Sequence, residues 1–169
     1  MECALFPWMA GIAERALIWD LKQVHRYFSE DGVRQAVQAR ILARVTADTR
    51  VLVAHSLGSV AAYETLCANP ELPVTTLVTL GSPLGTPNLI FDRLIPTPLA
   101  GCGAWPAGLK HWTNIADTGD VVALEKNLAP RFGNRVRDVL VYKGSHAHDC
   151  SRYLTAKETG LAIAQGLED

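Results

Sequence analysis

Ser56 is a candidate nucleophile because of the residues that surround it. It follows the apolar run Val51–Ala54, stands third in the pattern Ala-His-Ser-Leu-Gly (54–58), and precedes a second apolar stretch. A strand that turns sharply into a helix at a small-x-Ser-x-Gly sequence presents the serine hydroxyl at the tip of the bend. The helix N-terminus, with the N–H of Leu57, then faces the place where an oxyanion would form, and Gly58 is expected to be small because two backbones meet there. The alternative is that Ser56 only caps the helix, a position where serine is common.

A nucleophilic serine needs a histidine to take its proton and an acid to orient that histidine. After this kind of turn the acid and then the histidine follow along the chain, each in a loop at the carboxyl end of a strand. Two acids and two histidines occupy such loops: Asp117, Asp120, His146 and His148. The residues alone leave both choices open, and we expect the unused members to be a turn residue and a solvated loop residue.

The elements that position these groups follow from the pattern of apolar residues. Four short apolar runs without alternation are expected to be parallel strands buried on both faces: Val51–Ala54, Thr75–Leu80, Trp112–Ile115 and Val139–Tyr142. Helical periodicity predicts helices over Ala10–Phe28 and Val33–Val45, and a capping box at Thr155-x-x-Glu158 predicts a C-terminal helix. The sequence therefore predicts an α/β fold with a short parallel sheet of about four strands flanked by helices. We expect a single domain over 1–169, with a helical N-terminal segment (1–48) before the sheet-forming part (49–169).

A long segment, Ser82–Gly108, separates the second and third predicted strands. It holds five of the nine prolines and is also rich in large apolar residues. A loop of this length in a compact domain is often a lid or a binding loop, and the alternative is an irregular cover over the sheet. As a lid-like loop over Ser56, it would form the acyl side of a pocket with residues such as Leu89 and Phe91.

Composition excludes several classes of function. With 16 Lys and Arg against 17 Asp and Glu, the chain has a formal net charge of −1, so neither nucleic acid nor an anionic membrane surface is an expected partner. The apolar stretch Cys3–Ala13 is too short to span a bilayer, and we expect no membrane insertion and a cytoplasmic location. Four scattered cysteines, namely Cys3, Cys67, Cys102 and Cys150, form no metal-ligand or disulfide pattern, so no metal and no cofactor is expected.

Taken together, these motifs resemble the carboxyl-terminal half of an α/β-hydrolase of the serine esterase or lipase type. The segments that match in order and spacing are Ala-His-Ser-Leu-Gly-Ser (54–59), Gly-Ser-Pro-Leu (81–84), Trp112-x-Asn114 leading to Asp120-Val121, and Ala147-His148 followed by Tyr153-Leu154. The resemblance covers about two thirds of the chain and implies a truncated α/β-hydrolase fold. It implies Ser56 as the nucleophile, Asp120 as the acid, His148 as the base and the N–H of Leu57 as an oxyanion donor. The resemblance favours Asp120 because the acid of that family directly precedes the residue matched by Val121.

The chain departs from this family before the candidate nucleophile. Members normally carry further strands there, and a loop after the third strand donates a second N–H to the oxyanion, whereas Ser56 is preceded by two helical patterns within about 50 residues. The leading hypothesis is a serine hydrolase that cleaves an ester or thioester of a small-molecule acyl substrate through an acyl-enzyme. The alternative is an inactive or weakly active binding or regulatory module with the same fold. A cysteine enzyme using Cys150 is less favoured, because Cys150 opens a helix rather than a sharp turn.

The same departure predicts how the chain associates. Without a neighbouring strand from an amino-terminal half, the strand at Val51–Ala54 is expected to form an unprotected edge of the sheet. We therefore expect a homodimer, or a separate chain that covers this edge.

Overall fold

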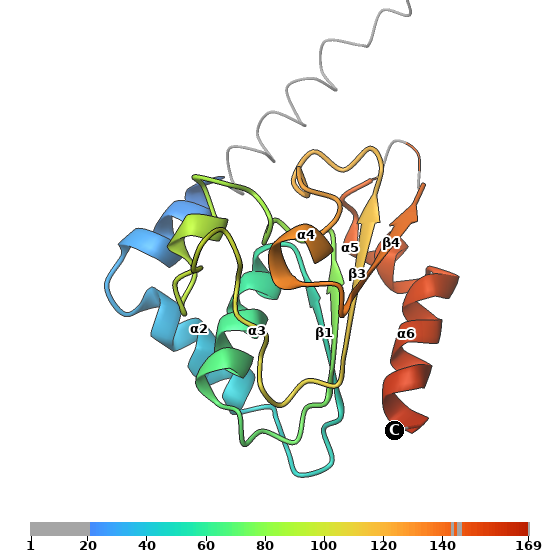
Figure 1. Ribbon diagram of the computed structural model, residues 1–169, viewed down its shortest axis with the longest axis horizontal. Coiled ribbons are helices and arrows are strands. Elements are labelled where there is room, and N and C mark those ends of the chain that lie inside the picture. Colours follow the sequence, from blue (N-terminus) through green and yellow to red (C-terminus); the bar gives the residue numbers. More distant parts are fainter. Residues whose placement is uncertain (1–20, 143, 145–146, 169) are drawn as a thin grey trace, which may run out of the picture.

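A parallel sheet of four strands forms the centre of the molecule (Figure 1). The computed structural model describes residues 21–142, 144 and 147–168. The strands pair in chain order and are β1 (Val51–His55), β2 (Thr76–Leu80), β3 (His111–Asp117) and β4 (Val136–Val141). Helices flank the sheet, so the predicted α/β fold with a short parallel sheet of about four strands is confirmed.

Helices cover both faces of this sheet. On one face lie α3 (Leu57–Ala68) and, outside it, α2 (Val33–Leu42); on the other lies α6 (Lys157–Glu168), which packs against β1, β2 and β3. Residues 21–29 are helical, while residues 10–20 of the first predicted helix lie outside the described residues. The remaining helices are short: η1 (Phe91–Arg93), α4 (Ala129–Phe132) and α5 (Cys150–Leu154). In the described part of the chain, no helix has the length and apolar character needed to cross a membrane.

The strands separate two apolar cores. Along β2, Leu77 belongs to the core shared with α2 and α3, whereas Val78 belongs to the core shared with α6, because successive side chains of a strand point to opposite faces. All five residues of β2 are buried, as expected for a strand covered on both faces. The prediction of full burial is wrong for the outer strands, since β1 is mostly half-buried and Leu140 of β4 is 53% exposed.

The C-terminal helix begins differently from the prediction. Thr155 ends α5 instead of capping α6, because its hydroxyl donates to the carbonyl oxygen of Ser151 at 2.9 Å. The cap that is formed is on α5, where the Asp149 carboxylate accepts from the backbone N–H of Ser151 at 2.8 Å. The capping-box interpretation is therefore wrong, although the predicted helix is present.

The segment after β2 contributes to the core more than to a lid. Leu84, Phe91 and Leu94 are buried in the core on the α3 side of the sheet. Burying these side chains favours folding by about 1.5–3 kcal/mol each, so this part of the segment is held down by its own apolar residues.

A buried carboxylate fastens the helices on the α3 side to one another. Glu64 of α3 is 1% exposed and accepts from the Tyr27 hydroxyl at 2.6 Å and from Gln38 Nε2 at 3.2 Å. It also accepts from the backbone N–H of Ile95 at 2.9 Å and pairs with Arg34 Nε at 3.3 Å. We call these residues the Glu64 cluster. It joins the helix of residues 21–29, α2 and the segment after β2 to α3.

Candidate active site

Ser56 occupies a strained turn between β1 and α3. Its backbone has φ 52° and ψ −134°, a conformation that non-glycine residues adopt at a cost of order 1–3 kcal/mol and that clusters at functional sites. Its backbone N–H donates to the carbonyl oxygen of Leu80, which ties the turn to the end of β2. Although Ser56 stands at the N-cap position of α3, its hydroxyl forms no capping bond. The simple capping interpretation is therefore wrong.

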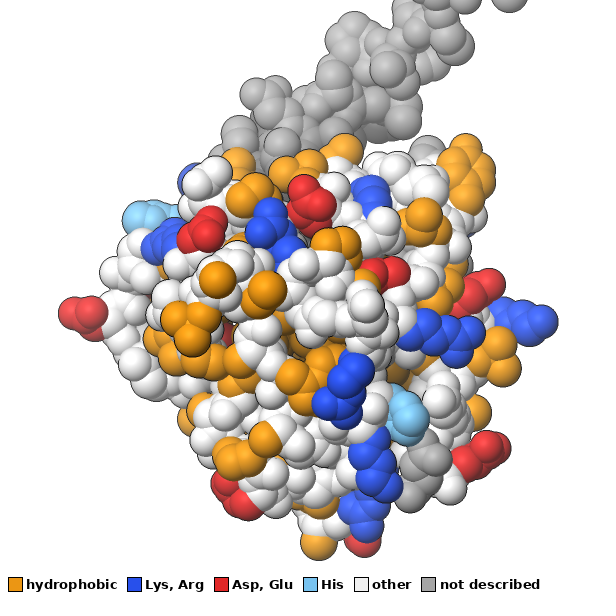
Figure 2. Space-filling view, viewed as in Figure 1, with side chains coloured by type: hydrophobic (Ala, Val, Ile, Leu, Met, Phe, Trp, Pro, Cys, Tyr) orange, Lys and Arg blue, Asp and Glu red, His pale blue; other side chains and the backbone are white. Residues whose placement is uncertain are grey.

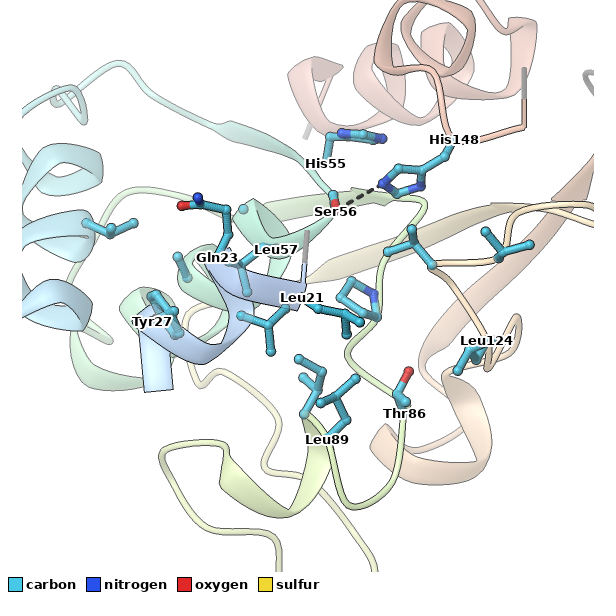
Figure 3. A pocket seen from close by; sticks show the side chains of 18 residues that line it. Leu21, Gln23, Tyr27, His55, Ser56, Leu57, Thr86, Leu89, Leu124 and His148 are labelled. Carbon is cyan, nitrogen blue, oxygen red and sulfur yellow. Dashed lines mark hydrogen bonds between the residues drawn. The ribbon is translucent and has the colours of Figure 1, made fainter. Parts of the chain in front are cut away.

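Three of the sequence-predicted side chains form one hydrogen-bonded path. His148 Nε2 lies 3.0 Å from Ser56 Oγ, and His148 Nδ1 lies 2.8 Å from Asp120 Oδ2 (Figure 3 shows the first contact). The three residues follow β1, β3 and β4, so their loops meet at the carboxyl edge of the sheet. Asp117 instead accepts from the backbone N–H of Gly119 at 2.8 Å within the turn after β3. His146 lies outside the described residues.

The Asp120 carboxylate is surrounded by donors. Oδ1 accepts from the backbone N–H groups of Val122 at 2.8 Å and Ala123 at 3.2 Å, and Oδ2 accepts from the Tyr153 hydroxyl at 2.8 Å. Burial alone would raise the pKa of Asp120, but the hydrogen bonds from His148, Tyr153 and Val122 outweigh it and lower the pKa. An ionised carboxylate can only accept, so His148 Nδ1 carries a proton. In the neutral ring Nε2 is then an acceptor for the Ser56 hydroxyl.

Gly81, at the end of β2, leaves the space that this arrangement needs. A Cβ at this position would lie 2.7 Å from Asp120 Oδ2, 3.0 Å from the Tyr153 ring and 3.2 Å from His148 Nδ1. Its φ of +53° also disfavours any side chain. Nothing in the Gly-Ser-Pro-Leu segment (81–84) by itself indicates this role for Gly81. The predicted packing role of Gly58 is wrong, since a Cβ at Gly58 would meet no described atom within 4 Å.

The His55 ring packs against the ring of His148, the candidate base. Its ring centroid lies 4.6 Å from that of His148, with the planes 37° apart, and 5.7 Å from that of Tyr153. Burial, followed by the nearby His148, lowers the pKa of His55. A histidine whose pKa is below its ordinary value is mostly uncharged at neutral pH, so His55 places no second positive charge beside His148.

An apolar cavity of about 440 Å³ opens beside Ser56 (Figure 3). The side chains at its mouth include Leu21, Leu89 and Leu124, which are 44%, 37% and 62% exposed. Hydrophobic side chains are also exposed among charged ones of both signs on the face seen in Figure 2. None of the lining residues that the structure describes is Asp, Glu, Lys or Arg. Phe91 is not one of them, so its expected place in the pocket is wrong, whereas Leu89 does line it.

The backbone at the start of α3 borders the same cavity. Leu57 and Gly58 both line it, and Leu57 is the first residue of the helix. The first four N–H groups of an α-helix have no acceptor one turn earlier. In α3 the N–H of Ser59 donates to the Ser56 carbonyl oxygen at 2.9 Å, so the N–H groups of Leu57 and Gly58 are the candidate donors to a bound group. The role of Leu57 as an oxyanion donor stays a prediction. Gln23, from the helix of residues 21–29, also lines the cavity (Figure 3).

Within residues 21–142, 144 and 147–168, no group of three or more His, Cys, Asp or Glu side chains is arranged to hold a metal ion. Cys67 is half-buried, and Cys102 and Cys150 are exposed, all three as free thiols.

Comparison with known proteins bears on the fold alone. No family model matches the sequence, and no curated protein matches it significantly. Among solved structures, the crystal structure of an esterase domain from a Rhodothermus marinus protein superimposes with a TM-score of 0.51 at 15% identity. The match covers 87% of this chain and 79% of that domain, so the chain has an esterase-like α/β fold.

Proposed function

We propose that the chain is a serine hydrolase that cleaves esters or thioesters through an acyl-enzyme. The observation that carries the proposal is the hydrogen-bonded path from Ser56 Oγ through His148 to Asp120, built on a strained turn between a strand and a helix. The esterase domain with the same fold supports this class of reaction by analogy.

The proposed reaction uses each atom of this path. His148 Nε2 takes the hydroxyl proton as Ser56 Oγ bonds to the acyl carbon, and the resulting imidazolium gives that proton to the leaving alcohol or thiol as its bond to the acyl carbon breaks. Water then donates a proton to His148 and adds to the acyl carbon. Ser56 Oγ departs with the proton that His148 returns, and the carboxylic acid is released. Asp120 accepts from Nδ1 throughout.

Stabilisation of the oxyanion is assigned to the start of α3. The N–H of Leu57 lies at the positive end of a twelve-residue helix whose first residues border the cavity. One such donor is worth about 2.7–4 kcal/mol of transition-state stabilisation in a serine hydrolase.

The cavity favours an uncharged apolar acyl group. Its described lining contains no charged side chain and is mostly aliphatic, so a charged acyl chain would lose its hydration without gaining a partner. We therefore expect esters with aliphatic acyl chains to be better substrates than dicarboxylic or amino-acyl esters.

Active-site labelling tests the proposal. A fluorophosphonate probe should label the parent chain, and peptide mass spectrometry should locate the label on Ser56. Ser56→Ala should abolish both labelling and hydrolysis of short p-nitrophenyl esters. Ser29→Ala is the matched control, because Ser29 contacts Arg93 on the exposed surface and should leave both signals unchanged.

Two outcomes would contradict the proposal. If Ser56→Ala is labelled as well as the parent, the nucleophile is another residue. If a folded parent is neither labelled nor active, the chain is a binding or regulatory module that keeps the fold without turnover.

A further inference from the structure

Tyr153 of α5 contacts the candidate acid from inside the protein. It is fully buried and does not line the cavity, so it has no access to substrate. Its hydroxyl lies 2.8 Å from Asp120 Oδ2, the same oxygen that lies 2.8 Å from His148 Nδ1. Two donors therefore share one carboxylate oxygen.

The direction of these hydrogen bonds follows from a third contact. The backbone N–H of Asp117 donates to the Tyr153 oxygen at 2.7 Å. Because an N–H can only donate, the Tyr153 oxygen is the acceptor of that bond, and its own proton is directed at Asp120. The end of β3 thus holds the hydroxyl in the orientation in which it donates to the carboxylate.

We propose that Tyr153 is a positioning residue that fixes Asp120 Oδ2 and limits how strongly this carboxylate holds the His148 ring. A carboxylate oxygen that already accepts one short hydrogen bond carries less negative charge toward a second donor. Tyr153 would thereby set the lowest pH at which His148 can take the proton of Ser56. This inference rests on the proposed hydrolase function.

Other charged and titratable groups among the described residues also face the site. In addition to Asp120 and His148, these groups are His55 from β1, Asp117 at the end of β3, Lys126 from the loop after β3, and Asp149 before α5. Burial raises the pKa of Tyr153, so the hydroxyl stays a neutral donor over the working range of the enzyme. The hydrogen bond from Tyr153 is also among the contacts that lower the pKa of Asp120.

The test compares two buried tyrosines. Tyr153→Phe removes the hydroxyl beside Asp120, whereas Tyr63→Phe removes an equally buried hydroxyl that donates to the carbonyl oxygen of Ala104, away from the site. Without Tyr153, the carboxylate holds the imidazolium more tightly, so the acidic limb of the kcat/KM profile should move up by about one pH unit. We expect kcat to fall about tenfold with little change in KM, because Asp120 also loses an anchor. Tyr63→Phe should change neither the limb nor kcat.

A spectroscopic readout makes the test independent of turnover. The downfield proton resonance of the His148 Nδ1–Asp120 bond should move further downfield in Tyr153→Phe and stay in place in Tyr63→Phe. Should Tyr153→Phe fail to fold, site-specific 3-fluorotyrosine at position 153 keeps the shape and donates more strongly. It should move the resonance and the pH limb in the opposite direction.

The outcomes separate the inference from the proposed function. If the parent chain shows no hydrolysis but the resonance shifts as stated, the hydrolase proposal fails and the effect of Tyr153 on the His148–Asp120 bond stands. If Tyr153→Phe matches Tyr63→Phe in resonance, or in pH limb and kcat, Tyr153 is only a structural residue and the inference is overturned.

Discussion

Replacing Gly81 with alanine inserts one carbon atom against the acid and base while leaving every functional group in the chain. The added Cβ would stand 2.7 Å from Asp120 Oδ2 and 3.2 Å from His148 Nδ1, closer than ordinary van der Waals contact. Restoring an unstrained carbon–oxygen separation requires a displacement of about 0.7 Å in the carboxylate or the backbone.

The size of the effect follows from that displacement. Misplacing a reacting group by about 1 Å costs about 10²-fold in rate, and losing the orienting acceptor of a triad histidine costs about 10⁴-fold. Gly81→Ala should therefore lower kcat/KM by about 10²- to 10⁴-fold, which corresponds to about 3–5 kcal/mol of transition-state stabilisation. The positive φ of the residue adds roughly 1–2 kcal/mol of folding strain.

A control substitution at a second glycine introduces backbone strain without crowding. Gly101 has φ +77°, and a Cβ there would meet no described atom within 4 Å, so Gly101→Ala carries the strain alone. Gly101→Ala should lower Tm by roughly 2–8 °C in differential scanning fluorimetry and Gly81→Ala by at least as much, and only Gly81→Ala should lose hydrolysis of p-nitrophenyl butyrate. A folded Gly81→Ala variant that retains kcat/KM within about threefold of the parent would contradict this prediction, since a displaced acid would cost far more.

Three further predictions concern the acid, the pocket and the edge of the sheet. Asp120→Asn should lower kcat by about 10⁴-fold and Asp117→Asn far less, and the reverse order in steady-state kinetics would move the acid role to Asp117. Leu89→Trp should lower the turnover of octanoyl relative to acetyl esters, while Phe91→Ala should lower Tm and leave that ratio unchanged; a ratio that responds only to Phe91 would contradict the pocket described above. β1 is an edge strand of the sheet formed by the described residues, so we expect a homodimer or a complex with a separate chain in light scattering, and a monomer at micromolar concentration with slowly exchanging β1 amides would refute this.

Local sequence patterns were sufficient for the four strands and the longer flanking helices, but not for the short helices η1, α4 and α5. The apolar run before Ser56 and the apolar helix after it identify the turn, because both elements and the bend between them are encoded within a few residues. Strand limits were less accurate: β4 begins at Val136, three residues before the predicted start, since the exposed Arg137 and the half-buried Asp138 interrupt the apolar run.

Contacts between distant residues could not be read in this way. Spacing allowed Asp117 or Asp120 as the partner of a histidine, because Asp117 ends β3 and Asp120 follows in the next turn. Only the folded arrangement places Asp120 Oδ2 within 2.8 Å of His148 Nδ1. The roles of Gly81 and Tyr153 depend on neighbours from other elements of the fold. Even the local capping rule failed at Thr155, where a bond back into α5 satisfied the hydroxyl first.

The Glu64 cluster holds one wall of the cavity in place, and it shares no residue with the path from Ser56 to Asp120. The helix of residues 21–29 forms one wall of the cavity and is fastened to α3 through Tyr27 and Glu64, whereas the path from Ser56 to Asp120 is held at the sheet edge by other bonds. We therefore expect substitutions on the cavity side of this helix to change the accepted ligand without displacing Ser56, His148 or Asp120. Ligand preference and bond cleavage can therefore change independently under natural selection or directed evolution. A library for new ligands belongs at Leu21 and neighbouring positions of the cavity wall, with the Glu64 cluster kept intact.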